Sequence, residues 1–148
     1  MEKVNLQNAA EALKENQEVE VLTSGRSMEP LLKEHRDIAV ISRAVAPFKK
    51  GDIVLYTRDN NKFILHRIVK STSTGLVIRG DNNLFYERGI KKEDILGILT
   101  AVYRNGKYMP RESAEFKRFG LFNQIRFPFI FIYRKTKYFL WKILKAKK

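Results

Sequence analysis

Residues 25–31 read Gly-Arg-Ser-Met-Glu-Pro-Leu. This stretch begins with a glycine, and it is predicted to be a loop that contains Ser27. Further along the chain, His66 lies inside a strand-like run, residues 63–70. A serine hydroxyl is a weak nucleophile at neutral pH, so it needs a base within hydrogen-bond reach and a third group that holds the base in the right tautomer. Ser27, His66 and Asp81 are the candidates for these three roles.

The composition is typical of a single folded body. The chain has 148 residues, of which 44% are hydrophobic, enough for a real core. It has no cysteine, which excludes disulfides, thiol catalysis and thiolate metal sites. Its two histidines, His35 and His66, are too few for a typical zinc centre, so we expect no metal and no other cofactor.

Positive charge is concentrated at the C-terminal end of the chain. The formal net charge is +13, and residues 116–148 hold ten Lys and Arg but no Asp or Glu, which leaves +3 for the preceding residues. Such a segment indicates an anionic partner, either phospholipid or nucleic acid. The N-terminal residues are acidic and lack an apolar stretch, so no signal peptide or membrane anchor is expected at that end.

Hydrophobic periodicity predicts one short helix followed by strands. Leu6, Ala9, Ala10 and Leu13 recur at helical spacing and indicate an amphipathic helix over residues 6–14. Beyond it, short runs rich in Val, Ile, Leu and Tyr, separated by turn sequences, are predicted to be strands: 19–22, 38–41, 53–56, 63–69, 76–78 and 95–103. We therefore expect a mainly β fold, a small antiparallel β-body with a coil or barrel-like closure, over residues 1–112.

The tail, residues 113–148, is basic and aromatic. It holds seven of the ten phenylalanines and the only tryptophan, Trp141. Its uncharged run at residues 127–133 is much shorter than the roughly 20 residues that span a bilayer as a helix, so we expect no crossing. Pro128 is predicted to break the tail into two helical pieces, the second of which has the composition of an amphipathic helix in the membrane interface.

Four landmarks in a fixed order make the sequence similar to the signal peptidase superfamily, which also includes the self-cleaving repressor peptidases. They are Gly25-Arg26-Ser27-Met28-Glu29-Pro30, Lys50-Gly51-Asp52-Ile53-Val54, Leu65-His66-Arg67-Ile68-Val69 and Arg79-Gly80-Asp81-Asn82-Asn83. The resemblance covers residues 19–103 and implies a signal-peptidase-like fold. It also implies a serine peptidase of the histidine-base type, because His66 stands where the bacterial leader peptidases and repressor peptidases carry lysine.

The loop residues themselves fit such a role. Gly25 lets the backbone approach a substrate closely, Pro30 fixes the loop past the nucleophile, and Ser27 is presented on the turn between them. Met28 either lines the substrate cleft or packs beneath the loop. We predict Gly25, Met28 and Pro30 as substrate-binding residues. Arg26 interrupts the Ser-Gly-Ser spacing of many signal peptidases, so backbone N–H groups, including that of Ser27, are expected to bind the oxyanion.

The base and its partner are predicted from alternation and turn chemistry. Alternation puts His66 on the same strand face as Ile64 and Ile68, an apolar setting that keeps the imidazole neutral and available as a base. Asp81 lies in a Gly-Asp-Asn turn from which its carboxylate could accept the other ring N–H of His66. Glu87 is the alternative third residue, since histidine-type relatives carry another candidate acid in that region.

The preferred hypothesis is a serine endopeptidase that cleaves a precursor or leader peptide at the membrane surface through an acyl-enzyme. The resemblance implies small side chains beside the scissile bond. The expected partners are the peptide and an anionic membrane bound by the tail, not nucleic acid, and the expected location is peripheral, on the cytoplasmic face. The alternatives are a lipid- or nucleic-acid-binding module that keeps the peptidase fold without turnover, and a repressor-type self-cleaving switch. The histidine base disfavours the switch.

Overall fold

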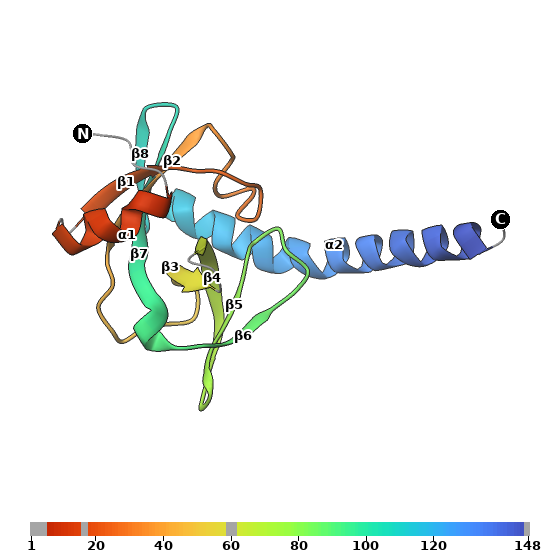
Figure 1. Cartoon of the computed structure of the whole chain (residues 1–148). Coiled ribbons are helices and arrows are strands. Elements are labelled where there is room, and N and C mark those ends of the chain that lie inside the picture. Colours follow the sequence, from red (N-terminus) through yellow and green to blue (C-terminus); the bar gives the residue numbers. More distant parts are fainter. Residues whose placement is uncertain (1–5, 16–17, 59–61, 147–148) are drawn as a thin grey trace.

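The structure of the protein, a computed structural model, describes residues 6–15, 18–58 and 62–146. Within these residues the chain forms one eight-stranded sheet, a short helix packed on it, and a long helix that extends away from it (Figure 1). The helices are α1 (Leu6–Glu15) and α2 (Ala114–Ala146), with a 3-10 turn, η1 (Lys92–Asp94). The strands are β1 (Glu18–Leu22), β2 (Asp37–Arg43), β3 (Ile53–Arg58), β4 (Lys62–Thr72), β5 (Gly75–Arg79), β6 (Glu87–Ile90), β7 (Ile95–Arg104) and β8 (Lys107–Pro110).

The sheet is built around β7. Its strand order is β1-β2-β7-β3-β4-β5-β6, and each neighbouring pair is antiparallel. One edge of β7 pairs with β2, while the other pairs first with β3 and then, through residues 101–104, with β8. The loop that carries Ser27 therefore enters the sheet through β2, and His66 belongs to the successive hairpins on the other side of β7.

Two apolar cores lie on opposite faces of the sheet, and β3 contributes to both. Ile53 and Leu55 belong to the larger core and Val54 and Tyr56 to the smaller one, because successive side chains of a strand point to opposite faces. The larger core also contains Ala9 and Leu13 of α1, together with buried residues of the Ser27 loop. The smaller core forms the surroundings of His66.

The predicted mainly β fold with a short N-terminal helix is confirmed. Each of the six predicted strands is present with ends extended by a few residues at most, and the predicted helix at residues 6–14 is α1. Two strands, β6 and β8, were not predicted. β6 reads Glu-Arg-Gly-Ile and β8 reads Lys-Tyr-Met-Pro, so neither has the alternating apolar pattern that reveals a strand. Both are paired at sheet edges, where backbone hydrogen bonds rather than side-chain burial define them.

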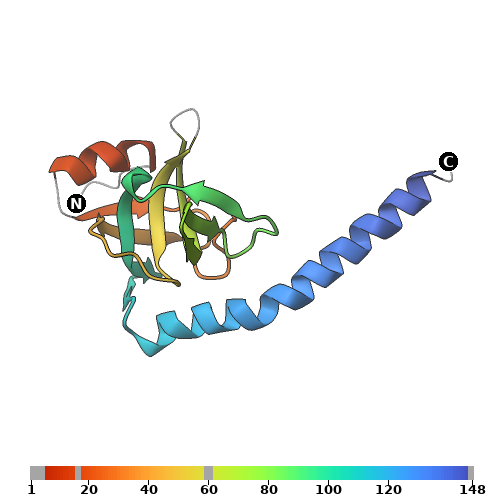
Figure 2. The same cartoon turned by 90° about the horizontal axis from the view of Figure 1, so that it is seen from below.

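The prediction that Pro128 divides the tail into two helical pieces is wrong. α2 is one helix of 33 residues with Pro128 inside it, and Figure 2 shows that it bends along its length. A proline removes one helical hydrogen bond and pushes away the carbonyl four residues earlier, which kinks a helix but need not end it. Ring packing between Phe127 and Phe131, 5.9 Å apart, spans the proline and holds the next turn in place.

Side chains of α2 are buried against the β-body only in the first part of the helix. Phe116 and Asn123 are buried, whereas from residue 132 onward the described side chains of the helix are exposed on all sides. The second half of the helix extends beyond the sheet in both views (Figures 1 and 2). Among the described residues, no helix combines the length and the apolar character needed to cross a membrane.

Candidate active site

Ser27 lies on a tight turn within the loop that joins β1 to β2, residues 23–36, which we call the nucleophile loop. Gly25 has a φ of +80°, a left-handed conformation that side chains other than glycine rarely adopt, and it turns the chain toward Ser27. The side chain of Met28 is buried directly beneath the turn, as part of the larger core. The turn is therefore held from below while Ser27 remains partly exposed.

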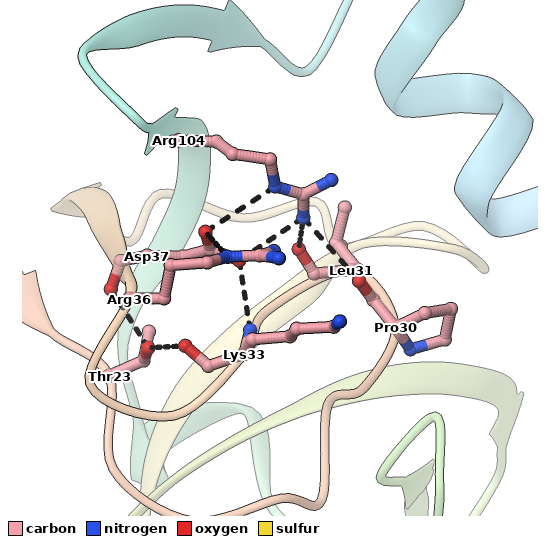
Figure 3. Close-up of polar contacts among 7 residues, drawn as sticks. All are labelled: Thr23, Pro30, Leu31, Lys33, Arg36, Asp37 and Arg104. Atoms are coloured by element: carbon pink, nitrogen blue, oxygen red, sulfur yellow. Dashed lines mark hydrogen bonds and ion pairs between the residues drawn. The ribbon is translucent and has the colours of Figure 1, made fainter.

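A buried aspartate, Asp37, anchors the C-terminal end of the nucleophile loop (Figure 3). Its carboxylate accepts hydrogen bonds from the Lys33 backbone N–H at 2.9 Å, from Arg36 at 2.7 and 2.8 Å, and from Arg104 at 3.1 Å. Burial by itself would raise the pKa of Asp37, but these donors outweigh burial and hold the pKa below its ordinary value. Asp37 thus stays ionised and keeps both arginines in place.

Arg104 and Thr23 extend this anchor along the loop. The guanidinium of Arg104, at the end of β7, also donates to the backbone carbonyls of Leu31 and Pro30 (Figure 3). The Thr23 hydroxyl lies 2.8 Å from both the Lys33 and the Asp37 carbonyl oxygens. Both ends of the nucleophile loop are therefore tied together, which fixes the turn on which Ser27 stands.

His66 is buried in the smaller core, with only 4% of its surface exposed. It lies in β4 directly opposite Val54 of β3. Its Nδ1 atom is 3.1 Å from Oε1 of Glu87 and 3.2 Å from the hydroxyl of Tyr56. We assign the ring proton to Nδ1, because a carboxylate can only accept a hydrogen bond. Nε2 then carries the lone pair that a general base requires, with Asn83 Nδ2 3.5 Å away as a weak donor to it.

The surroundings of His66 keep this ring neutral. Burial lowers the pKa of His66 below its ordinary value of 6.5, and the charge and hydrogen bond of Glu87 only partly offset that effect. The same cluster raises the pKa of Tyr56, first through burial and then through the negative charge of Glu87. At neutral pH the imidazole and the phenol of this cluster are therefore both neutral.

Gly80 marks the point at which the nucleophile loop meets His66. A Cβ atom added to Gly80 would lie 2.8 Å from His66 Nε2 and 2.8 Å from the Ser27 carbonyl oxygen, so these two atoms are no more than twice that distance apart. The basic nitrogen of His66 thus faces the backbone of Ser27. Among the described contacts no hydrogen bond joins the two side chains, and in ligand-free enzymes such bonds often tighten only with substrate.

The carboxylate of Asp81 is directed toward Arg67 instead of His66. Arg67 donates two hydrogen bonds to it, from Nε at 2.8 Å and Nη2 at 2.7 Å, and the aspartate side chain is almost fully buried. The next residue but one, Asn83, approaches the other ring nitrogen of His66, with Nδ2 and Nε2 3.5 Å apart. The Gly-Asp-Asn segment therefore surrounds His66, but its aspartate is bound to another side chain.

A small cavity of about 30 Å³ opens beside Ser27. It is lined by residues of β1, β2, β4 and the nucleophile loop: Val21, Thr23, Ser24, Gly25, Ser27, Met28, Leu32, Ala39 and Leu65. Met28 and Gly25 therefore border both the cavity and Ser27. Pro30 is not part of this lining, and the peptide bond that precedes it is cis.

The structure brings Ser27, His66 and Glu87 into one region and places Asp81 at its border. Three further residues of this region, Tyr56, Gly80 and Asn83, had no predicted role. Tyr56 could have been found by alternation, because it follows Val54, the strand partner of His66, by two residues on the same face. Within the described residues, no group of His, Asp and Glu has the arrangement of a metal site.

A protein-family model matches most of the β-body. The model of the family described as Peptidase S24-like matches residues 4–102, well over half of the chain. Fold and match together define a serine-peptidase-like hydrolase.

The chain belongs to the Peptidase S24-like family, and the resemblance to the signal peptidase superfamily seen in the four landmarks is confirmed at this level. A search of curated proteins found no match to the chain.

Proposed function

We propose that the protein is a serine endopeptidase in which Ser27 is the nucleophile, His66 the base and Glu87 the group that orients His66. The observation that carries this proposal is the meeting of His66 Nε2 and the Ser27 backbone around Gly80, with Glu87 on the opposite nitrogen of the ring. Of the two predicted acids, Glu87 is the one with a contact to His66, so we favour it over Asp81.

The chemistry then follows the usual sequence of acyl transfer. The Ser27 hydroxyl attacks the peptide carbonyl while its proton passes to His66 Nε2, and Glu87 stabilises the imidazolium that forms. His66 returns the proton to the leaving amine, and water hydrolyses the acyl-enzyme with His66 again as base. The backbone N–H of Ser27 has no hydrogen-bond partner among the described residues, which supports its use as an oxyanion donor.

The substrate we propose is an extended precursor or leader peptide with a small side chain next to the scissile bond. The cavity beside Ser27, about 30 Å³, has room for little more than a methyl or hydroxymethyl group. Its walls are mostly apolar, apart from the hydroxyls of Thr23, Ser24 and Ser27. A larger side chain would have to displace Met28 or Leu32, both of which are buried in the core.

We also propose that α2 attaches the protein peripherally to an anionic membrane. Exposed large apolar side chains recur three or four positions apart within residues 121–133 and again within residues 139–144, and at 100° per residue both sets fall on the outer face of the helix: Leu121, Phe122, Ile125, Phe129, Ile132, Tyr133, Phe139, Leu140, Ile143 and Leu144. We call this set the outer stripe. Asn123 and Phe127, which pack on the β-body, lie on the opposite face. Residues 116–148 carry ten cationic and no acidic residues, which suits anionic lipid.

Cleavage can be tested with the peptides encoded beside the gene, incubated with the wild type and the variants Ser27→Ala and His66→Ala and analysed by mass spectrometry. Each variant is expected to lose cleavage by about 10⁴-fold or more. The same spectra of the protein itself reveal any self-cleavage. A Ser27→Ala protein that still cut the peptide would exclude Ser27 as the nucleophile.

Membrane attachment can be tested by flotation with phosphatidylglycerol vesicles, and with phosphatidylcholine vesicles for comparison. We expect flotation only with the anionic lipid, weakened by salt and abolished by Ile132→Asp or Leu140→Asp in the outer stripe. Tyr138→Asp adds the same charge to an exposed residue outside the stripe and is the matched control. If a single-stranded oligonucleotide binds the protein and prevents its flotation with anionic vesicles, nucleic acid would be favoured as the partner.

A further inference from the structure

Asn82 contacts the nucleophile loop through both of its hydrogen-bond donors. Its backbone N–H donates to the carbonyl oxygen of Ser27 at 2.7 Å, and its side-chain amide donates to the carbonyl oxygen of Arg26 at 3.1 Å. These are the two peptide groups that set the direction of the Ser27 side chain. Asn82 therefore restrains the nucleophile without touching the reacting atoms.

The two acceptors of the same residue face α2. Arg134 donates from Nη1 to the Asn82 backbone oxygen at 3.0 Å and from Nη2 to the side-chain oxygen at 3.2 Å. Arg126 reaches the same side-chain oxygen at 3.4 Å. All four polar groups of Asn82 are thus used, two toward the nucleophile loop and two toward the helix, so the residue forms a bridge between these parts of the chain.

A second contact of α2 involves Arg79 and Tyr86, which lie on either side of Asn82 in the chain. The ring of Phe127 packs under the guanidinium of Arg79, with Cζ 3.4 Å from the ring centroid, and meets the edge of Tyr86 at 6.2 Å. Among the described residues, Nε and Nη1 of Arg79 have no hydrogen-bond partner, which makes this aromatic contact important for the buried guanidinium. Tyr86 immediately precedes Glu87, the partner of His66.

We infer that α2 is part of the catalytic apparatus as a positioning element, and that Asn82 is the positioning residue through which it holds Ser27 in register with His66. The helix contacts the segment from Arg79 to Glu87 at both ends, and that segment carries the support of the nucleophile and the support of the base. Arg134 and Phe127 face this segment while the outer stripe faces away from it. The same helix can therefore bind lipid and brace the active site at once.

This inference rests on the proposed function, since it names the regulation of that site, and it is tested in the full-length chain without lipid. Arg134→Ala and Asn82→Ala are each expected to lower kcat for a soluble peptide by about tenfold with little change in KM, because the nucleophile is displaced and not the peptide. Arg134→Ala should lower kcat by a smaller factor when it is introduced into Asn82→Ala than when it is introduced into the wild type. Asn82→Asp keeps the acceptor for both arginines and the backbone donor to Ser27 but loses the side-chain donor to Arg26, so the Arg134→Ala effect should be reduced in this background but not abolished.

Lys137→Ala is the matched control. Lys137 is an exposed cation on the same helix with no contact to the segment among the described residues, so kcat should stay at the wild-type value in either background. A wild-type kcat in Arg134→Ala would overturn the inference.

Amide hydrogen exchange separates this outcome from failure of the proposed function. Arg134→Ala is expected to lose protection at the Asn82 N–H, which donates to Ser27, whether or not any peptide is cut. If Arg134→Ala loses this protection and the wild type cleaves no peptide, the positioning role of α2 is supported and the proposed peptidase function is refuted. If the protection is unchanged, the positioning role of α2 is refuted.

Discussion

The carboxylate of Glu87 lies 3.1 Å from Nδ1 of His66, although 21 residues separate them in the chain. This contact occupies Nδ1, while Nε2 faces Gly80 and the nucleophile loop. The two acids of the region have different partners. Glu87 contacts the histidine, and Asp81 is paired with Arg67.

Glu87→Gln is expected to lower kcat by roughly 10²- to 10⁴-fold, because an amide neither fixes the tautomer reliably nor stabilises the imidazolium. Its melting temperature should fall only slightly, since glutamine keeps the shape of the side chain and the ion-pair partner lost at Oε2, Arg58, is largely exposed. Steady-state kinetics and calorimetry of the same preparation check both parts. Wild-type kcat in this variant would remove Glu87 from the mechanism.

Asp81→Asn is expected to act mainly on stability. It breaks a buried ion pair and leaves the Arg67 guanidinium partly unpaired, at a cost of about 3 kcal/mol in the free energy of unfolding. Urea unfolding followed by fluorescence measures this loss. A variant with wild-type stability but a 10⁴-fold lower kcat would instead assign Asp81 the role we give to Glu87.

The pH dependence follows from the direction of the His66 pKa shift. Because burial holds the pKa of His66 below 6.5, kcat/KM should be level at pH 7 and fall only at pH values below 6.5. Below pH 6.5 the unfolded chain binds a proton at this position that the folded protein resists, so the free energy of unfolding should also decrease as the pH falls toward the folded pKa.

Two variants check that assignment. In Glu87→Gln the main influence that raises the pKa of His66 is lost, so the acid limb of its residual activity should move to lower pH. In His66→Gln the free energy of unfolding should decrease less than in the wild type as the pH falls below 6.5, because the titrating imidazole is gone. An acid limb above pH 6.5 in the wild type would contradict the assignment of a buried neutral base.

Gly80→Ala is expected to separate the base from the nucleophile. The new methyl group would lie 2.8 Å from both His66 Nε2 and the Ser27 carbonyl oxygen, so one of them must move. A displacement of this kind is expected to lower kcat by about 10²-fold. Gly120→Ala is the control, because its Cβ would meet no atom closer than 3.7 Å and alanine favours the helix. Equal kcat values for the two variants would contradict the geometry around Gly80.

Arg104→Ala is expected to loosen the nucleophile loop. It removes one of the two arginines of a fully buried aspartate together with donors to the Pro30 and Leu31 carbonyls, which should cost about 3 kcal/mol of stability and lower kcat as well. Arg43→Ala, at the exposed end of β2, is the control and should change neither quantity. Thermal unfolding and peptide cleavage measure the two effects.

Much of the fold could be predicted because its strands carry their own pattern. Runs such as residues 53–56 and 76–78 are short, apolar and bounded by turn residues, and the structure confirms them as β3 and β5. β6 and β8 could not be predicted, since pairing partners define them rather than their own residues. The continuous α2 was missed because local rules treat Pro128 as a breaker, whereas contacts of Phe127 with Arg79 and Phe131 hold the helix across it.

Some residues of the candidate site could be predicted and others could not, because some stand in local sequence motifs and others depend on contacts between distant parts of the chain. Ser27 and His66 were selected from local sequence, and their roles stay predictions until activity is measured. The choice between Asp81 and Glu87 depended on β6, whose pairing with β5 brings Glu87 opposite Ile78 and thus near His66. Asn82 could not be selected at all, because its importance comes from contacts with residues more than forty positions away on either side.

The anchor between Asp37 and Arg104 spans 67 residues of sequence. Since translation proceeds from the N-terminus, a nascent chain contains both Ser27 and His66 well before the arginine that fixes the loop has been synthesised. The proposed peptidase activity would then appear only after position 104 has been synthesised, so incomplete chains would not cleave neighbouring polypeptides.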